Sequence, residues 1–213
     1  MPAVVTPGTA NTTSAGTFDV TIPAHSAGDE LVVQWVKIQT SSASPTVSTG
    51  GWTSTTVQPT GTATLHIGQA WKTGDGSETT VRITNMSGGT VIGKVYKVTG
   101  SDAATVGTPS YDTSTATTTA DLDVGTVVTG DVGFFVCGFA NTTSSPSLDN
   151  GYTLDVSNAN YLMGYKVTDS TDESVPATWT PSRHYRAALT VLRATVTAGV
   201  PRVMFHRRMQ GMA

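Results

Sequence analysis

One stretch of this sequence occurs twice, and the repetition limits the fold more than any other feature. In residues 71–78 an apolar run ends at Trp71 and Lys72, a Gly-rich turn follows, and Glu78 precedes an alternating, Thr-rich run. A looser copy of this pattern occupies residues 165–173. Alternation of polar and apolar residues is typical of a half-buried strand, and Gly and Asp are typical of turns. Each copy therefore predicts two strands joined by a turn.

Further landmarks follow the same order before and after residue 105. We therefore interpret the chain as two sequence-similar halves, at about residues 17–104 and 120–196. The paired landmarks are Phe18-Asp19-Val20 with Leu122-Asp123-Val124, Gly28-Asp29 with Gly130-Asp131, Gly51-Trp52-Thr53 with Gly151-Tyr152-Thr153, Glu78 with Glu173, and the apolar run 91–98 with 187–193.

The composition predicts an all-β protein. Thr, Ser, Gly and Val dominate, only 13% of the residues are charged, and long runs of helix-forming residues are missing. Short, regularly spaced strands separated by Gly, Pro and Ser are typical of a β-sandwich. Because a half with few large apolar residues buries little surface, we expect both halves to build one sandwich, a jelly roll. Two tandem Ig-like modules divided near residue 105 are the alternative.

The regions outside the repeat suggest three segments and a cytoplasmic origin. We expect an N-terminal arm at 1–16, the sandwich at 17–196 and a C-terminal extension at 197–213. The start of the chain lacks the basic and apolar regions of a signal peptide, and no apolar run reaches the length of a membrane span. The net charge of -3 favours neither nucleic acid nor an anionic membrane as a partner. A single cysteine excludes an intramolecular disulfide.

The acidic turns are the first candidates for chemistry. Asp75 and Glu78 border the Gly-rich turn, and Asp169, Asp172 and Glu173 cluster in its counterpart. Several carboxylates in one loop can hold a hard cation such as Ca²⁺. In a hairpin, however, Asp and Gly supply the turn geometry and Glu stays solvated. The spacing matches no known ligand loop, so we favour the hairpin and predict no metal-binding residue.

Catalytic groups are equally hard to assemble. His184-Tyr185-Arg186 places a base beside a phenol, but no serine has the context of an activated nucleophile. His25 and His66 lack the spacing of a zinc site. Cys137 lies in an apolar run and is expected to be a small buried hydrophobe. We therefore predict no catalytic or cofactor-binding residues and expect that the protein is not an enzyme.

The aromatic residues allow two readings. They could form a platform on which sugars stack, or they could fill the core. Most of them recur at matching places in both halves, and that recurrence favours packing. The residues are Trp35, Trp52, Trp71, Trp179, Tyr152 and Tyr165.

The C-terminal extension differs in character from the rest of the chain. It is rich in arginine and methionine, and a terminal segment of this kind is expected to be ordered only where a partner holds it. Two adjacent arginines are a weak footprint for nucleic acid, so we expect protein contacts instead. The predicted assembly contacts are Arg202, Met204, Phe205, His206, Arg207 and Arg208.

The ordered landmarks resemble a widespread group of bacteriophage virion proteins. The resemblance covers about residues 17–194, and its motifs are structural. It implies a jelly-roll-like β-sandwich in a tail, fibre or head-decoration protein, and it carries over no catalytic residues. The motifs are Gly28-Asp29, Gly51-Trp52-Thr53, Trp71-Lys72, Gly76-Ser77-Glu78, Val81 to Thr84, Gly100-Ser101-Asp102 and the final strand 188–194.

These observations lead to one functional expectation and one rival. We expect a non-enzymatic phage structural protein, made in the bacterial cytoplasm and built into the virion, where it decorates or cements the capsid surface. Its partners would be major capsid or tail proteins and further copies of itself, for example in a trimer. A tail or fibre component is the alternative, as is an adhesin that binds host surface glycans through exposed aromatic residues.

Overall fold

The computed structural model describes residues 3–13, 16–39, 44–57, 65–86, 89–105, 110–169 and 172–195. These residues form sixteen strands, and no helix occurs among them. None of them therefore belongs to a helix that could span a membrane. The predicted all-β class is confirmed, as is a sandwich-like packing of antiparallel sheets.

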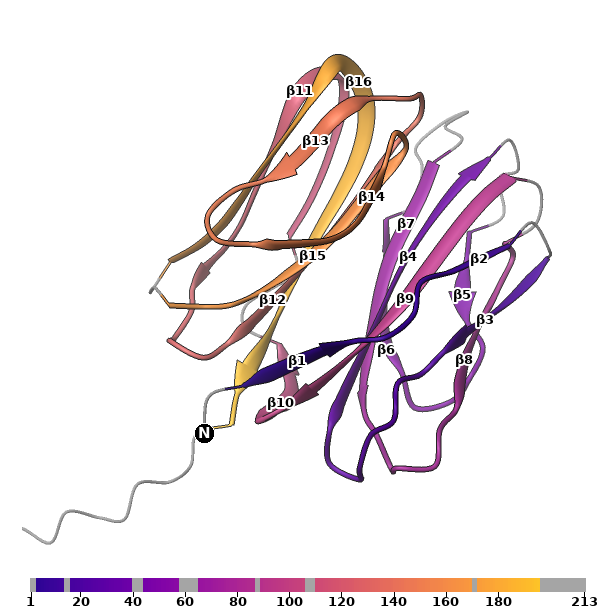
Figure 1. The fold of residues 1–213 in the computed structure, drawn as a ribbon, viewed down its shortest axis with the longest axis vertical. Coiled ribbons are helices and arrows are strands. Elements are labelled where there is room, and N and C mark those ends of the chain that lie inside the picture. Colours follow the sequence, from indigo (N-terminus) through magenta and orange to yellow (C-terminus); the bar gives the residue numbers. More distant parts are fainter. Residues whose placement is uncertain are drawn as a thin grey trace, which may run out of the picture.

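The first half contains two sheets that face each other (Figure 1). Two strands of the outer sheet, Thr17–Thr21 and Thr80–Thr84, alternate between buried residues and more exposed ones, as expected for a sheet with one face in water. The inner sheet has the order β1 (Val4–Pro7), β9 (Gly89–Thr99), β4 (Glu30–Gln39), β7 (Leu65–Thr73) and β6 (Thr53–Val57), and β2 (Asn11–Thr13) also pairs with β9. The outer sheet has the order β3 (Thr17–Thr21), β8 (Thr80–Thr84) and β5 (Thr46–Val47).

The second half is built around one long strand, β16 (Asp172–Ala194). Its last part pairs with β12, whereas its first part pairs with β13 and with the end of β11. A single strand thus belongs to both layers of this half. The inner order is β10 (Ser101–Thr105), β16, β12 (Val132–Phe139), β15 (Tyr161–Val167) and β14 (Thr153–Asn158), while β11 (Ser110–Thr126) and β13 (Ser144–Leu148) also pair with β16.

The two halves have the same order of paired strands. The inner strands β9, β4, β7 and β6 correspond to the end of β16, β12, β15 and β14. The registers agree as well, because Glu30 pairs with Thr73 and Val98. Its counterpart Val132 pairs with Val167 and Leu192.

One equivalence differs from the sequence-based expectation by two residues. Val20 pairs with Val81, and Leu122 pairs with Val175. Leu122 precedes Gly130 by as many residues as Val20 precedes Gly28. Leu122 therefore takes the place of Val20, and not the place of Phe18. Because side chains alternate with a period of two, a shift of two residues keeps the same face buried, and the sequence pattern alone does not detect it.

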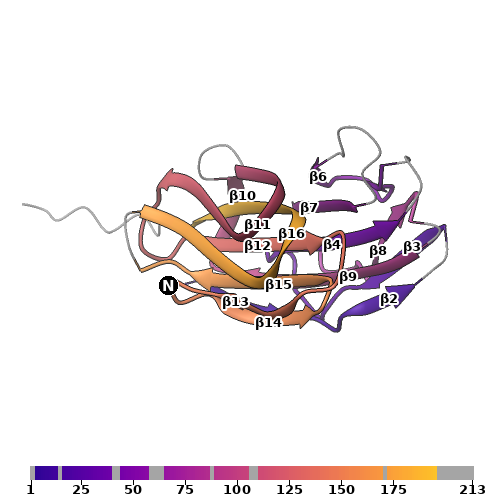
Figure 2. The same ribbon diagram turned by 90° about the horizontal axis from the view of Figure 1, so that it is seen from above.

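Each half has a core of its own, which differs from the single shared sandwich that we expected. One buried cluster extends from Phe18 to Val95 and fills the first half. Another extends from Ala120 to Val191 and fills the second. Two further clusters contain residues of both halves: one includes Trp71 and Leu192, and the other includes Val36 and Val136. The inner sheets therefore pack face to face between the two cores (Figures 1 and 2).

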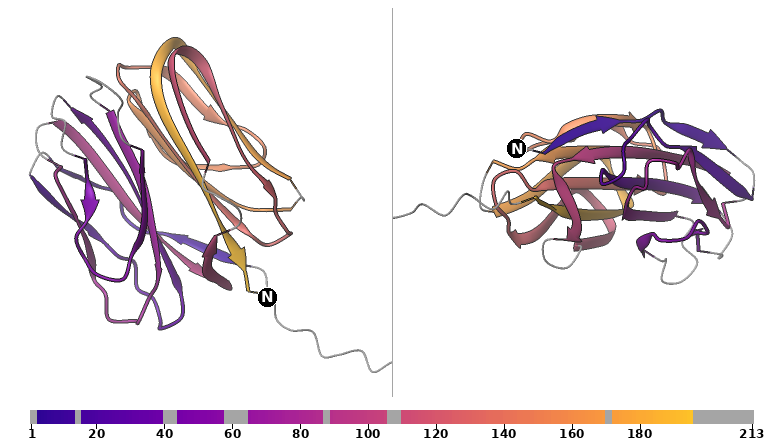
Figure 3. Two further views of the ribbon diagram at one scale, coloured as in Figure 1. Left: turned by 180° about the vertical axis from the view of Figure 1, so that it is seen from behind. Right: turned by 90° about the horizontal axis from the view of Figure 1, so that it is seen from below.

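The expected arm and the junction between the two halves also contribute strands. Within the arm, β1 and β2 pair with β9 at one edge of the inner sheet. At the junction, β9 ends at Thr99 and β10 begins at Ser101, so Gly100 alone joins the two inner sheets. Gly100 has a φ of 85°, a conformation that favours glycine. The views from behind and below show β1 and β10 at the end of the molecule where the N-terminus lies (Figure 3).

Candidate functional site

The acidic turn of the first half is held by the chain itself. The Oε2 atom of Glu78 lies 2.8 Å from Nε2 of His25 and accepts a hydrogen bond from the backbone N–H of Asp75 at 3.0 Å. Its Oε1 atom forms an ion pair with Lys72. Burial disfavours the charged form of Glu78, but the bonds from Lys72 and His25 outweigh this effect and hold its pKa well below the usual range. The Glu78 carboxylate therefore ties the turn to the end of β7, through Lys72, and to the loop between β3 and β4, through His25.

The Gly-Asp turns have the same structure in both halves. Asp29 Oδ2 accepts from the backbone N–H of Ser26 at 2.9 Å, and Asp131 Oδ2 accepts from that of Val128 at the same distance. The backbone N–H of Gly74 donates to Asp29 O, just as that of Thr168 donates to Asp131 O. These repeated aspartates thus stabilise turns.

The acidic counterpart in the second half is more open. Lys166 lies 3.2 Å from Asp169, whose side chain is 82% exposed. The side chains of Asp172 and Glu173 lie outside the described residues. No group of three potential metal ligands occurs in the described part of the chain.

The aromatic residues pack as the favoured interpretation predicted. Trp35, Trp71, Trp179 and Tyr152 are buried. Trp52 and Tyr165 are partly buried and pack against the clusters of the first half and of the interface. The structure thus confirms core packing for this set.

The remaining single candidates are dispersed. His184 is exposed and Tyr185 lies in the second core, where its ring is 4.8 Å from that of Trp179. Arg186 is 7% exposed, and burial lowers its pKa. His66 is fully buried in β7. Cys137 is buried in the second core, as predicted.

The predicted assembly contacts lie outside the described residues. These are Arg202, Met204, Phe205, His206, Arg207 and Arg208.

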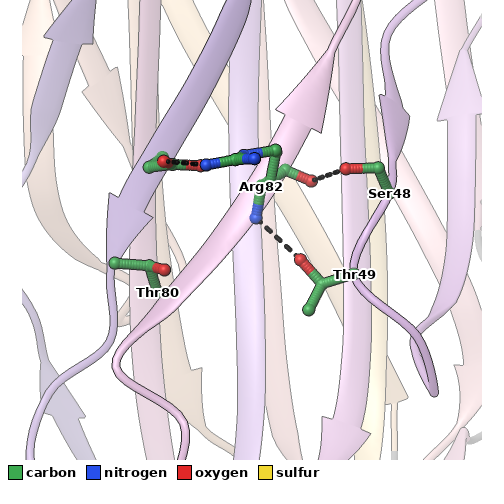
Figure 4. Close-up of a pocket in the computed structure, with 5 residues that line it drawn as sticks. Ser48, Thr49, Thr80 and Arg82 are labelled. Carbon is green, nitrogen blue, oxygen red and sulfur yellow. Dashed lines mark hydrogen bonds and ion pairs between the residues drawn. The ribbon is translucent and has the colours of Figure 1, made fainter.

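Sequence reasoning missed a polar pocket on the outer sheet (Figure 4). The pocket has a volume of about 320 Å³. Arg82 of β8 reaches across to Asp19 of β3, donating from Nε and Nη2 at 2.7 Å each. The hydrogen bonds and charge of Arg82 lower the pKa of Asp19. The pocket is lined by Asp19, Ser48, Thr49, Thr80 and Arg82.

The segment after β5 fixes the other wall of this pocket. Ser48 donates its backbone N–H to Arg82 O at 2.9 Å, and Thr49 Oγ1 accepts from Arg82 N at 2.9 Å. The only sequence signal for this site is that Asp19 and Arg82 each stand between two buried apolar residues, which directs both outward.

Polar side chains also cross the interface between the halves. Gln69 Nε2 donates to Phe134 O at 2.8 Å, and Thr190 Oγ1 donates to Gln69 Oε1 at 2.6 Å. Lys94 lies 2.6 Å from Asp155. These contacts fix one arrangement of the inner sheets.

Comparisons with known proteins return no relative for this chain. No protein-family model matches it. No curated protein matches it. No solved structure matches it.

Proposed function

We propose that this chain is a non-enzymatic structural protein of a bacteriophage virion, which decorates or cements the capsid surface. The observation that carries the proposal is how the repeated polar motifs are used. The Gly-Asp turns bond to their own backbone in both halves, and Glu78 binds His25 and Lys72. Residues that are engaged in this way support a scaffold and are unavailable for turnover.

We further propose that each half is a jelly roll. If β1 and β2 share the first position, the inner sheet of the first half has the strand order 1-8-3-6 and the outer sheet has 2-7-4. A jelly roll distributes its eight strands between two sheets in this alternating way. The fifth strand, β6, departs from that arrangement because it pairs with β7 at the edge of the inner sheet. Jelly rolls are frequent in viral capsid proteins, so this order supports a virion role.

The proposed partners are capsid or tail proteins and further copies of this chain. We propose that the segment 197–213 makes these contacts, because its apolar and basic residues suit a protein surface. Deletion of residues 198–213 should leave the thermal unfolding temperature nearly unchanged and reduce the oligomer fraction in analytical ultracentrifugation. A large fall in the unfolding temperature would instead assign this segment to the folded core.

The virion role is tested directly on particles. Phage particles from a host that carries this gene would be purified and examined by mass spectrometry and by immunogold labelling with an antibody against the chain. We expect the protein in purified particles, with gold on the head. Labelling of the tail would support the tail or fibre alternative, and absence from purified particles would refute the proposal.

A carbohydrate-binding adhesin remains the second candidate, and it would be exposed on the same particles. The buried positions of Trp35, Trp71 and Trp179 argue against an aromatic platform for sugars. Any such binding must therefore use another surface.

A further inference from the structure

The duplication serves as an internal control for the role of each residue. A side chain that both halves need for the fold has a counterpart in each, as Asp29 and Asp131 do. The ion pair of the pocket has none. Asp19 pairs in register with Arg82, whereas the matching position Asp121 pairs with Pro176. Proline has no cationic side chain, so the position paired with Asp121 supplies no counterpart of Arg82.

Solvent screening limits what the ion pair can contribute to the stability of the first half. Its side chains are 57% exposed at Arg82 and 42% exposed at Asp19. Exposed ion pairs are screened by water and are worth little to folding. An arginine and an aspartate held in bidentate geometry on an open sheet face, at little benefit to the fold, are available to bind a ligand.

From the lining of the pocket we propose that it binds a saccharide. Asp19 and Arg82 together are neutral, so the pocket has no net charge that would select a free anion. The lining contains no large apolar side chain that would select a hydrophobic ligand. It offers carboxylate acceptors, guanidinium donors and three hydroxyl groups. Neighbouring hydroxyl groups of a sugar ring both donate and accept, and they match this set.

The geometry leaves part of the Arg82 guanidinium for such a ligand. Asp19 engages Nε and Nη2. Among the described residues, no side chain or backbone atom bonds to Nη1. A sugar hydroxyl can therefore accept from Nη1 while a second hydroxyl donates to Asp19. Hydrogen bonds to charged groups are stronger than those between neutral groups, so two of them would fix the orientation of the ring.

The test uses the purified full chain on a printed glycan array, followed by saturation-transfer NMR with the free monosaccharide of the best-bound glycan. We expect binding that Asp19→Asn and Arg82→Met weaken by at least about tenfold, since each removes a charged hydrogen-bonding group. Thr80→Val removes one lining hydroxyl and should weaken binding less. Asp169→Asn is the matched control, because it removes an exposed carboxylate from an ion pair of the second half.

Each outcome decides for or against the site. Circular dichroism and thermal unfolding confirm that the variants are folded, which the exposure of both side chains leads us to expect. If no glycan on the array is bound, the proposal is overturned. It is also overturned if Asp19→Asn and Arg82→Met leave the binding unchanged. A response to sialylated or sulfated probes alone would identify an anion site and also overturn it. The virion role does not depend on any of these results.

Discussion

Two glutamates of the first half, the buried Glu30 and the partly buried Glu78, have pKa values that are shifted in opposite directions. Glu78 has Lys72 and His25 as partners, and these hold its pKa low despite burial. Glu30 is 2% exposed, and burial raises its pKa although Thr73 donates a hydrogen bond to Oε1 at 2.8 Å. The difference follows from the number of charged partners, because a buried carboxylate without a cation is disfavoured in its charged form.

Replacement of Glu78 by glutamine should destabilise the protein by about 1–3 kcal/mol at neutral pH, because Lys72 and His25 lose a charged acceptor. The lowered pKa means that this stabilisation is complete above about pH 4.5, the usual value, and is lost as the pH falls further. Urea unfolding of the parent and of Glu78→Gln between pH 3 and pH 7 measures this stabilisation. As a control, Asp169→Asn should leave the unfolding midpoint unchanged. Equal midpoints for Glu78→Gln and the parent protein would contradict this role.

Glu30→Gln should have the opposite effect. Because the folded pKa is raised, stability is lost as the pH rises above the usual value of 4.5, where the buried group must ionise. Glutamine keeps the shape and can still accept from Thr73, so the variant should be more stable than the parent at neutral pH. The difference in unfolding free energy between the variant and the parent should become smaller towards pH 4. A less stable variant at pH 7 would show that the charge has a partner that stabilises it.

At the scale of elements, the inner sheet of the first half depends on one close approach. Gly68 of β7 lies against the ring of Trp35 on β4, and a Cβ atom at Gly68 would overlap that ring. Trp35 is fully buried, so it has little freedom to move away. Gly68 therefore makes room for the largest side chain of this core.

The substitution Gly68→Ala should destabilise the protein by about 1–3 kcal/mol, as overpacking of a core does. Gly50→Ala is the control, since a Cβ atom there would meet nothing within 4 Å. Thermal unfolding followed by circular dichroism measures the stability of both variants and of the parent. If Gly68→Ala unfolds at the temperature of the parent, the contact is looser than the structure indicates.

Sequence patterns predict elements better than they predict their partners. Alternation places Asp19 and Arg82 on outer faces, but it contains no information that β3 pairs with β8. The same period of two is compatible with either Ala120 or Leu122 as the counterpart of Phe18. The separate cores were missed for a related reason: apolar residues of β4 and β12 are buried on both faces, and periodicity does not reveal which sheet covers each face.

At the scale of the whole molecule, the interface between the halves contains two neighbouring glutamines with different surroundings. Gln34 and Gln69 pair in register across β4 and β7, and both are fully buried. Gln69 bonds to Phe134 and Thr190 of the other half. Neither amide atom of Gln34 has a partner among the described residues. Gln69 therefore joins the halves, whereas Gln34 is a buried polar group without hydrogen bonds that opposes folding.

Leucine at these two positions should have opposite effects. Gln69→Leu leaves the buried Thr190 hydroxyl without its acceptor and removes the side-chain donor to Phe134 O, and it should cost about 1–3 kcal/mol. Gln34→Leu removes two unpaired polar atoms and should be neutral or stabilising. Urea unfolding midpoints of the two variants compare them directly. Equal losses for both would show that the two amides are equally well bonded.

The junction at Gly100 has a consequence for how this interface can evolve. With one residue between β9 and β10, the two inner faces meet at a very high effective concentration, as linked binding modules do. Most of the translational entropy that opposes the association of separate partners is thereby removed. The contact surface can consequently retain groups that weaken it, such as Gln34, where a freely dissociating dimer of the same sheets would fall apart. The covalent link at Gly100, and not only the packing, therefore determines how many unpaired polar groups the interface can contain and still remain closed.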